Sequence, residues 1–186
     1  MFDNERYDLE IKKRLTPSRY QHSINVAQTA RLLAERFGGD CERAYTAGLL
    51  HDILKDTPSA ELSKLMAEYF PLATPLERGA KKLWHAMAGS EFVRRELKLE
   101  DEAIITAIRY HTTGRAGMSL LEKIVFVADF ISADRCYDGV ERMRLKAAED
   151  LSLAMEEGLQ FTIIELCRGL HAVHPDTLSA YNEIVL

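Results

Sequence analysis

The residues most able to do chemistry in this chain are histidines and aspartates at apolar positions of helical patterns. His51 and Asp52 follow the small residues within 44–48, and Asp129 lies inside the apolar run 125–131. A carboxylate in such a run is costly to bury unless it is paired or binds a metal. The other candidates, each on a separate predicted helix, are His22, His85 and His111. Helix bundles build metal sites from inward-facing side chains of this kind, so the sequence predicts a metal site.

The types of these side chains narrow the metal and the reaction. Imidazoles and carboxylates without a thiolate suit iron, manganese, zinc, cobalt or nickel better than copper(I) or calcium. Six such ligands exceed the three or four that one catalytic zinc needs. They suit two metals about 3.5–4 Å apart that share a bridging carboxylate, a pair that activates water and neutralises phosphoryl charge. The sequence therefore predicts metal-assisted hydrolysis of a phosphoester or phosphoanhydride.

The elements that must position these groups are predicted to be helices nearly everywhere. Apolar residues recur at three- and four-residue steps from 22 to 37, between a Thr16-Pro17 start and a Gly38-Gly39 stop. Further helices are predicted over 4–15, from the cap Asp40 to 54, from Thr57-Pro58, from Thr74-Pro75, and over 100–111, 119–132, 140–157, 159–170 and 175 onward. The run 124–127 could instead be a buried strand, but the capping box at Ser119 and Glu122 favours a helix. The prediction is one all-α domain of eight to ten helices.

Composition and charge exclude several classes of protein. The chain has 186 residues, of which 47% are hydrophobic and 28% charged, enough for a packed core without disulfides. A net charge of −5 argues against binding of a nucleic acid polymer through its phosphates. Residues 1–15 lack the apolar segment of a secretory signal, and no uncharged stretch is long enough to span a bilayer. These features predict a cytoplasmic protein with no membrane contact, and its size is compatible with a homodimer.

The sequence resembles a known family. The order of His22, His51-Asp52 and Asp129 is similar to the H…HD…D signature of HD-domain phosphohydrolases. Longer stretches resemble the YqeK-type branch, namely RYQHS at 19–23, GLLHDILK at 48–55, AIRYHTTGR at 107–115, and MSLLEK at 118–123 leading into ADFI at 128–131. The resemblance covers essentially the whole chain. It implies a single HD domain over 1–186, with a metal-binding core at about 16–135 and helices at 139–186 completing the bundle and the nucleotide pocket.

Members of that branch are symmetrical diadenosine tetraphosphate hydrolases, which cut the central phosphoanhydride to give two ADP at a di-iron-type centre. The resemblance implies a first metal held by His22, His51, Asp52 and Asp129. It also implies that Asp52 bridges to a second metal, which His85 and His111 hold as well. Iron is the expected metal, and manganese, cobalt, nickel and zinc are alternatives.

The resemblance also implies a set of substrate contacts around the metals. Lys55, one turn after Asp52, is expected to contact a phosphate oxygen and to act with Asp52 in catalysis. Arg19, one turn before His22, is expected to contact a phosphate oxygen. Arg135 is expected to hold the retained phosphates through two guanidinium N–H groups. The remaining expected substrate contacts are His85, His111, Thr112, Thr113, His171, His174, Pro175 and Asp176.

Other interpretations remain open at this point. The chain could be an HD-type phosphohydrolase or nucleotidase acting on another nucleotide, or a module that binds metal and nucleotide without turnover. A di-iron oxygenase uses the same ligand types. Single residues also have simpler roles, because Asp129 could pair with an arginine, Lys55 could be a solvated surface lysine, and His171 and His174 could be surface or capping groups. The complete ligand set together with Lys55 favours a hydrolase.

Overall fold

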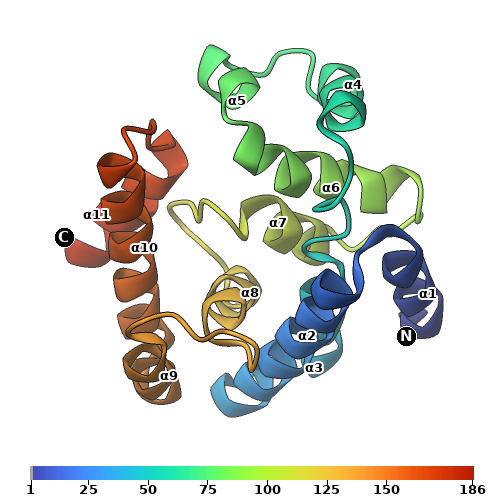
Figure 1. Cartoon of the computed structure of the whole chain (residues 1–186). Helices are drawn as coiled ribbons and strands as arrows, with labels where there is room; N and C mark the ends of the chain where they lie inside the picture. Colours follow the sequence, from blue (N-terminus) through green and yellow to red (C-terminus); the bar gives the residue numbers. More distant parts are fainter. Residues whose placement is uncertain (1) are drawn as a thin grey trace.

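Eleven α-helices and one short 3₁₀-helix make up the fold of residues 2–186, the part of the chain that the computed structural model describes (Figure 1). In chain order these are α1 (Asn4–Arg14), α2 (Pro17–Phe37), α3 (Cys41–Leu50), α4 (Ser59–Tyr69), α5 (Pro75–Gly79), η1 (Lys81–Leu83), α6 (Trp84–Arg95), α7 (Glu102–Tyr110), α8 (Leu120–Ile131), α9 (Val140–Glu149), α10 (Leu151–Arg168) and α11 (Pro175–Val185). No strand occurs in residues 2–186, so the all-α prediction is confirmed. The expected eight to ten helices are one too few, because the segment that starts at Thr74-Pro75 forms two α-helices, the single turn α5 and the longer α6, separated by η1.

Most helices begin where the sequence signals place them. Asp40 and Asp101 accept hydrogen bonds from the first free backbone N–H groups of α3 and α7, and Ser119 forms the predicted capping box of α8. Thr16 precedes α2 but does not cap it. Its hydroxyl and its backbone N–H both donate to Asp56 Oδ2 at 2.8 Å, which fixes the start of α2 to the turn after α3.

Helix α3 ends at Leu50, four residues earlier than the predicted end at 54. His51 keeps helical backbone angles, but residues 51–56 form successive turns, with Lys55 N donating to Asp52 O at 2.8 Å. The Nδ1 atom of His51 lies 2.7 Å from the carbonyl oxygen of Gly48 and satisfies a group that the helix end leaves free. Lys55 therefore lies three residues after Asp52 in a non-helical turn, and the two side chains do not share the face of a continuing helix.

The boundary between α9 and α10 also differs from the prediction. The helices predicted over 140–157 and 159–170 are found as Val140–Glu149 and Leu151–Arg168, because Asp150 is extended and its side chain caps α10. Gly158 is no break but lies inside α10. A Cβ there would come within 2.7 Å of Met143 Cε and 3.2 Å of the Phe126 ring. The glycine therefore permits close packing of α10 against α8 and α9.

Helix α8 lies at the centre of the bundle, between the α2–α3 pair and the group formed by α9, α10 and α11 (Figure 1). Its residue Val125 joins one apolar cluster with α1, α3, α4, α6 and α7, whereas Phe126 joins a second cluster with α2, α9 and α10. The run 124–127 is therefore helix and not strand. Because α8 lies where the two clusters meet, Asp129 on its last turn faces the middle of the molecule. Nowhere in residues 2–186 is a helix long and apolar enough to cross a bilayer.

Candidate metal centre

All six predicted metal ligands converge near one point in the interior. Five of them are almost completely buried, and the sixth, Asp129, is partly exposed. They come from separate elements, with His22 on α2, His51 and Asp52 directly after α3, His85 on α6, His111 directly after α7 and Asp129 on α8. The helical fold thus brings together groups that are as much as 107 residues apart in the chain.

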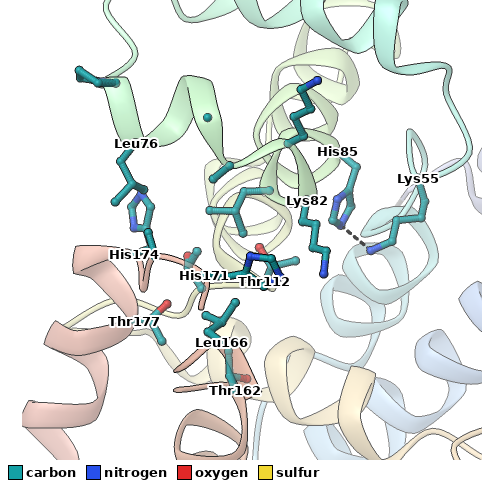
Figure 2. Close-up of a pocket in the computed structure, with 17 residues that line it drawn as sticks. Lys55, Leu76, Lys82, His85, Thr112, Thr162, Leu166, His171, His174 and Thr177 are labelled. Atoms are coloured by element: carbon teal, nitrogen blue, oxygen red, sulfur yellow. Dashed lines mark hydrogen bonds between the residues drawn. The ribbon is translucent and has the colours of Figure 1, made fainter. Parts of the chain in front are cut away.

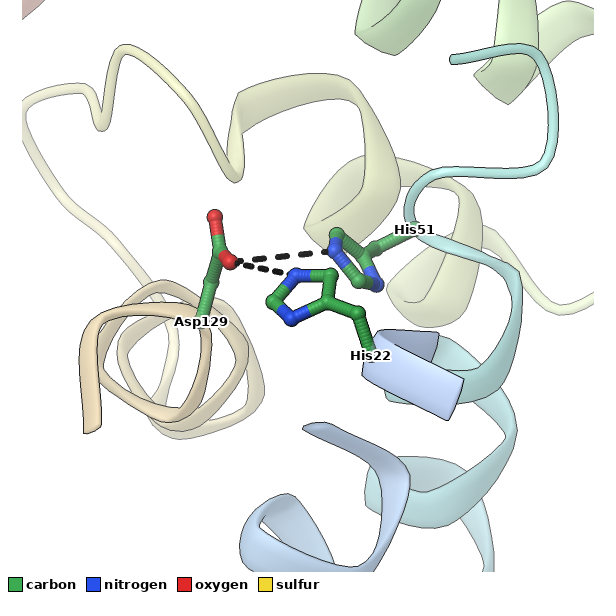
Figure 3. A group of neighbouring side chains, drawn as sticks. All are labelled: His22, His51 and Asp129. Carbon is green, nitrogen blue, oxygen red and sulfur yellow. Dashed lines mark hydrogen bonds and ion pairs between the residues drawn. The ribbon is translucent and has the colours of Figure 1, made fainter. Parts of the chain in front are cut away.

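Three of these residues form a first group that could hold a metal ion. The candidate ligand atoms of His22, His51 and Asp129 lie within 4.8 Å of one another. Asp129 Oδ1 is 3.0 Å from His22 Nε2 and 3.9 Å from His51 Nε2. Figure 3 shows the carboxylate of Asp129 pointing from α8 toward the two imidazole rings. One cation between these three side chains would contact all of them.

A second group that could hold a metal ion contains Asp52 and shares His51 with the first group. His51, Asp52 and His111 also have ligand atoms within 4.8 Å of one another. Asp52 Oδ1 is 3.1 Å from His85 Nε2 and 3.5 Å from His111 Nε2, whereas its Oδ2 is 3.6 Å from His51 Nε2. The two oxygens of Asp52 therefore face different imidazoles, which is the arrangement that a bridging carboxylate requires.

Backbone carbonyls fix the orientation of two imidazoles in the same way. His51 Nδ1 is 2.7 Å from Gly48 O, and His111 Nδ1 is 2.8 Å from Ile108 O, each three residues earlier at the end of a helix. A carbonyl can only accept, so each Nδ1 carries the hydrogen and each Nε2 carries a free lone pair. Such contacts commonly orient metal-binding histidines.

Asp134 plays the corresponding part for His22, and the sequence analysis did not single it out. Its Oδ2 accepts a hydrogen bond from His22 Nδ1 at 2.7 Å, and its Oδ1 accepts one from Asn25 Nδ2 at 2.9 Å. Burial opposes ionisation of Asp134, but Asn25 and His22 lower its pKa to about 2. Burial would lower the pKa of His22, but the carboxylates of Asp129 and Asp134 outweigh it and raise that pKa.

The protonation states of the other groups suit a cation. Burial lowers the pKa of His51 and of His85 to about 4 in each case, so both imidazoles are neutral at pH 7. Burial alone would raise the pKa values of Asp52 and Asp129, but nearby imidazoles and cationic side chains hold both well below the usual range. The centre thus combines the ionised carboxylates of Asp52 and Asp129 with the neutral imidazoles of His51 and His85, the forms in which these groups bind metals.

Unsatisfied polar atoms are a direct test of whether a metal fits this centre. His51 Nε2 and Asp52 Oδ1 are buried and make no hydrogen bond of acceptable geometry to any described residue. A buried polar atom without a partner costs about 1–3 kcal/mol. Cations at the two groups would satisfy both atoms, His51 Nε2 in the first group and Asp52 Oδ1 beside His85 and His111, and the donor set matches the preferences of iron, manganese, cobalt, nickel and zinc. The residues present therefore fit a metal.

Asp129 also forms an ion pair with Arg135. Pairing with an arginine is the simpler role for Asp129 that the sequence left open. Arg135 Nη2 donates to Asp129 Oδ1, and its Nε donates to the backbone carbonyl of Asp129 at 2.7 Å. An ionised carboxylate has about four lone-pair positions, so the ion pair and a metal bond are compatible. On the other side of the centre, Arg19 Nη1 is 3.5 Å from Asp52 Oδ2. Both predicted arginines thus lie against candidate metal ligands.

A pocket of about 570 Å³ opens beside His85 (Figure 2). The predicted substrate contacts that line it are Lys55, His85, Thr112, Thr113, His171 and His174. Pro175 and Asp176 do not line it, because they form the first turn of α11, where His174 Nδ1 accepts from the backbone N–H of Asp176. Lys81 and Lys82 do line the pocket, although the sequence analysis did not name them. Their position just before His85 was the available signal.

Comparisons with known proteins agree with this geometry. The model of the HD domain family matches residues 19–134. The chain is 41% identical to the symmetrical bis(5'-nucleosyl)-tetraphosphatase of Bacillus subtilis (strain 168), over 94% of each chain. It is 32% identical to the enzyme of the same name from Staphylococcus aureus (strain NCTC 8325 / PS 47), over 94% of this chain and 87% of that one.

A solved structure is similar over the full length. It is the crystal structure of a predicted HD superfamily hydrolase involved in NAD metabolism from Clostridium acetobutylicum, with a TM-score of 0.95 and 32% identity. The match covers 100% of this chain and 98% of that one. The chain therefore belongs to the HD domain family, in the branch that contains the symmetrical bis(5'-nucleosyl)-tetraphosphatases.

Proposed function

We propose that this protein is a metal-dependent hydrolase that cleaves diadenosine tetraphosphate at its central phosphoanhydride bond and releases two ADP. One observation carries the proposal: a centre of four imidazoles and two carboxylates, nearly all of it buried, lies beside a pocket whose lining includes three lysines. The names of the relatives support the substrate and the symmetrical cleavage.

The number and types of the side chains in the centre support a pair of metal ions. His22, His51, Asp52 and Asp129 would hold one, and Asp52, His85 and His111 would hold the other. When bound, such a pair supplies a water of lowered pKa as the nucleophile and neutralises charge on the phosphoryl oxygens. We propose iron as the metal in the cell, with manganese, cobalt, nickel and zinc sharing the same ligand preferences.

Lys55 has the position required to act on the phosphates. Its Nζ lies 3.0 Å from His85 Nε2 and 3.5 Å from Asp52 Oδ1, and it lines the pocket. An ammonium group here would offset the negative charge that moves onto the leaving phosphate oxygens. Lys82 also lines this pocket, and Figure 2 shows its side chain beside His85 and extending toward the other lining residues, so it is a second candidate group for the phosphates.

The larger pocket is proposed to hold one ADP half of the substrate. Thr112 and Thr113 follow the ligand His111 directly, and His171 and His174 come from the segment between α10 and α11. The helices within 139–186 thus complete a pocket whose opposite wall is α5 and η1. Arg135 and Arg19 lie against Asp129 and Asp52, so they would be in position to contact phosphates bound at the metals.

A product assay tests the proposal. Metal-stripped protein is reloaded with Fe²⁺ or Mn²⁺ and incubated with diadenosine tetraphosphate, and the nucleotides are separated by anion exchange. We expect ADP as the only nucleotide product. AMP with ATP would mean asymmetrical cleavage. If no product forms with Fe²⁺ or Mn²⁺, the assay is repeated with Co²⁺, Ni²⁺ and Zn²⁺. No product with any of these five metals, while ADP still binds, would mean a binding module without catalysis.

A further inference from the structure

A second pocket, of about 250 Å³, adjoins the metal centre on the side of Asp129. The larger pocket adjoins the centre on the side of His85 instead. Thr112 lines both pockets, so they meet beside His111. The residues lining the smaller pocket are His111, Thr112, Asp129, Phe130, Arg135, Tyr137 and Phe161.

One wall of the smaller pocket is aromatic. Phe161 on α10 is 42% exposed, although it belongs to a cluster of rings. Its ring lies 5.4 Å from that of Tyr137 at an interplanar angle of 32°, and 6.4 Å from that of Phe130 at 87°. The hydroxyl of Tyr137 donates to the carbonyl oxygen of Phe130 at 3.1 Å, which holds the Tyr137 ring in place. The wall is therefore a fixed, partly open aromatic surface, suited to stacking by a flat ring.

The lining of the pocket also includes a cation. Arg135 donates to the backbone carbonyl oxygen of Asp129 at 2.7 Å and to the Asp129 carboxylate. Its guanidinium therefore lies against a candidate metal ligand, in the same pocket as the aromatic wall. A ligand that fits this pocket has a flat ring at one end and negative charge at the end that reaches the metals.

We propose that this pocket binds the second nucleoside of the dinucleotide, with its base stacked against Phe161 and its phosphates beside Arg135. The assignment rests on the proposed function, because cleavage at the middle of the substrate places the two halves on either side of the metals. Two pockets that meet at the centre, one beside His85 and one beside Asp129, meet this requirement. Because this pocket is smaller than the one beside His85, it would enclose the second base only in part.

A comparison with adenosine 5'-tetraphosphate as substrate isolates the contribution of the second nucleoside. It has the same four phosphates but one adenosine, and hydrolysis of its central anhydride gives ADP and pyrophosphate. The measured quantity is kcat/KM for diadenosine tetraphosphate divided by kcat/KM for adenosine tetraphosphate. We expect Phe161→Ala to reduce this ratio about 5- to 150-fold, the loss that removal of one base stack produces. Phe161→Trp keeps a stacking surface and should preserve the ratio.

The matched control is Ile164→Ala, which removes an equally exposed apolar side chain from α10 outside this pocket. It should leave the ratio unchanged. An unchanged ratio for Phe161→Ala would overturn the inference while the proposed function stands, provided that the unmodified protein forms ADP. An equal fall on both substrates would also overturn it, because Phe161 would then support the fold and not the second nucleoside. Failure of the unmodified protein to form ADP would instead reject the proposed function.

Discussion

Asp52 has a position that no other side chain in the centre shares. One of its oxygens faces His85 and His111, and the other faces His51. The residue is buried, and its pKa is held well below the usual range although burial alone would raise it. An ionised carboxylate in this place is stable only with cationic or hydrogen-bonding partners around it. Metal binding and hydrolysis should therefore depend on the same residue.

We expect Asp52→Ala to weaken metal binding by more than about 100-fold and to abolish ADP formation, since a direct ligand matters more than the groups that orient it. Metal content by mass spectrometry and product analysis measure the two effects. Asp138→Ala, which removes an exposed carboxylate after α8, is the control and should change neither. Full activity in Asp52→Ala would exclude the bridging role.

Lys55 should act differently, because it is no metal ligand. Lys55→Ala should lower kcat by about 100-fold, the typical cost of removing one group that stabilises charge in the transition state. Metal content should stay at the level of the unmodified protein. The control is Lys64→Ala, which removes an exposed lysine on α4. Loss of metal together with turnover would show that Lys55 maintains the centre and does not act on the phosphates.

The sequence predicts the central residues well because their surroundings are unusual. A carboxylate within 125–131 and histidines on apolar helix faces have few explanations other than a buried polar site. Asp134 and Lys82 could not be predicted in this way. Both stand in polar stretches, and only the packing of distant helices brings them to His22 and to the pocket.

At the scale of helices, the crossing of α2 and α3 sets the distance between His22 and His51. Gly48 lies at this crossing, where an added Cβ would be 2.8 Å from Ala27 Cα. Backbone cannot move aside as a flexible side chain can. Any larger residue at 48 must therefore separate the two helices.

We expect Gly48→Ala to lower the free energy of unfolding by about 1–3 kcal/mol, despite the better helix propensity of alanine. Urea denaturation of the metal-free protein measures this change. Gly79→Ala is the control, since a Cβ there meets no atom within 4 Å. Equal stability of both variants would mean that α2 and α3 cross more loosely than the structure indicates.

The start of α7 gives a prediction about pH. Burial opposes ionisation of Asp101, but Arg43 and the backbone N–H groups of Ile104 and Ala103 lower its pKa below the ordinary value of 3.8. Its contribution to stability is therefore complete above about pH 4 and is lost as the pH falls through the lowered value. Asp101→Ala should cost about 1 kcal/mol at pH 7, the usual value of a helix cap.

The test is urea denaturation of Asp101→Ala and of the unmodified protein at several pH values. The difference between them should shrink as the pH falls below 3.8. The comparison is Glu5→Ala, which removes a carboxylate from the first turn of α1 that does not cap the helix, since Asp3 is the cap there. A difference that does not change with pH would show that the carboxylate charge of Asp101 adds nothing to the cap.

Helix boundaries show which features of the fold the sequence predicts and which it does not. Caps at Asp40, Asp101 and Ser119 are local chemistry, and the structure places these three starts where the sequence does. The predicted boundary between α9 and α10 was placed at Gly158 and is wrong, because the helices meet at Asp150. Gly158 is instead required where α10 packs against Met143 and Phe126, and only the folded bundle brings these residues near it.

At the scale of the molecule, two apolar clusters meet along α8, and the polar centre lies at their junction. The pockets on its two sides are built from segments that are distant in sequence, such as 75–83 and 162–177 for the larger one. The all-α class follows from periodicity in each segment, whereas the two pockets depend on how segments meet. This is why the convergence of the six histidines and aspartates could be predicted and the aromatic wall at Phe161 could not.

We propose that imidazoles and carboxylates from five helical segments hold two metal ions. The decisive measurement is an anomalous difference map from crystals of the Mn²⁺-loaded protein. We predict two peaks about 3.5–4 Å apart. One should lie among His22, His51 and Asp129, and the other beside His85 and His111, with Asp52 between them. A single peak, or no peak at these side chains in saturating Mn²⁺, would contradict the account.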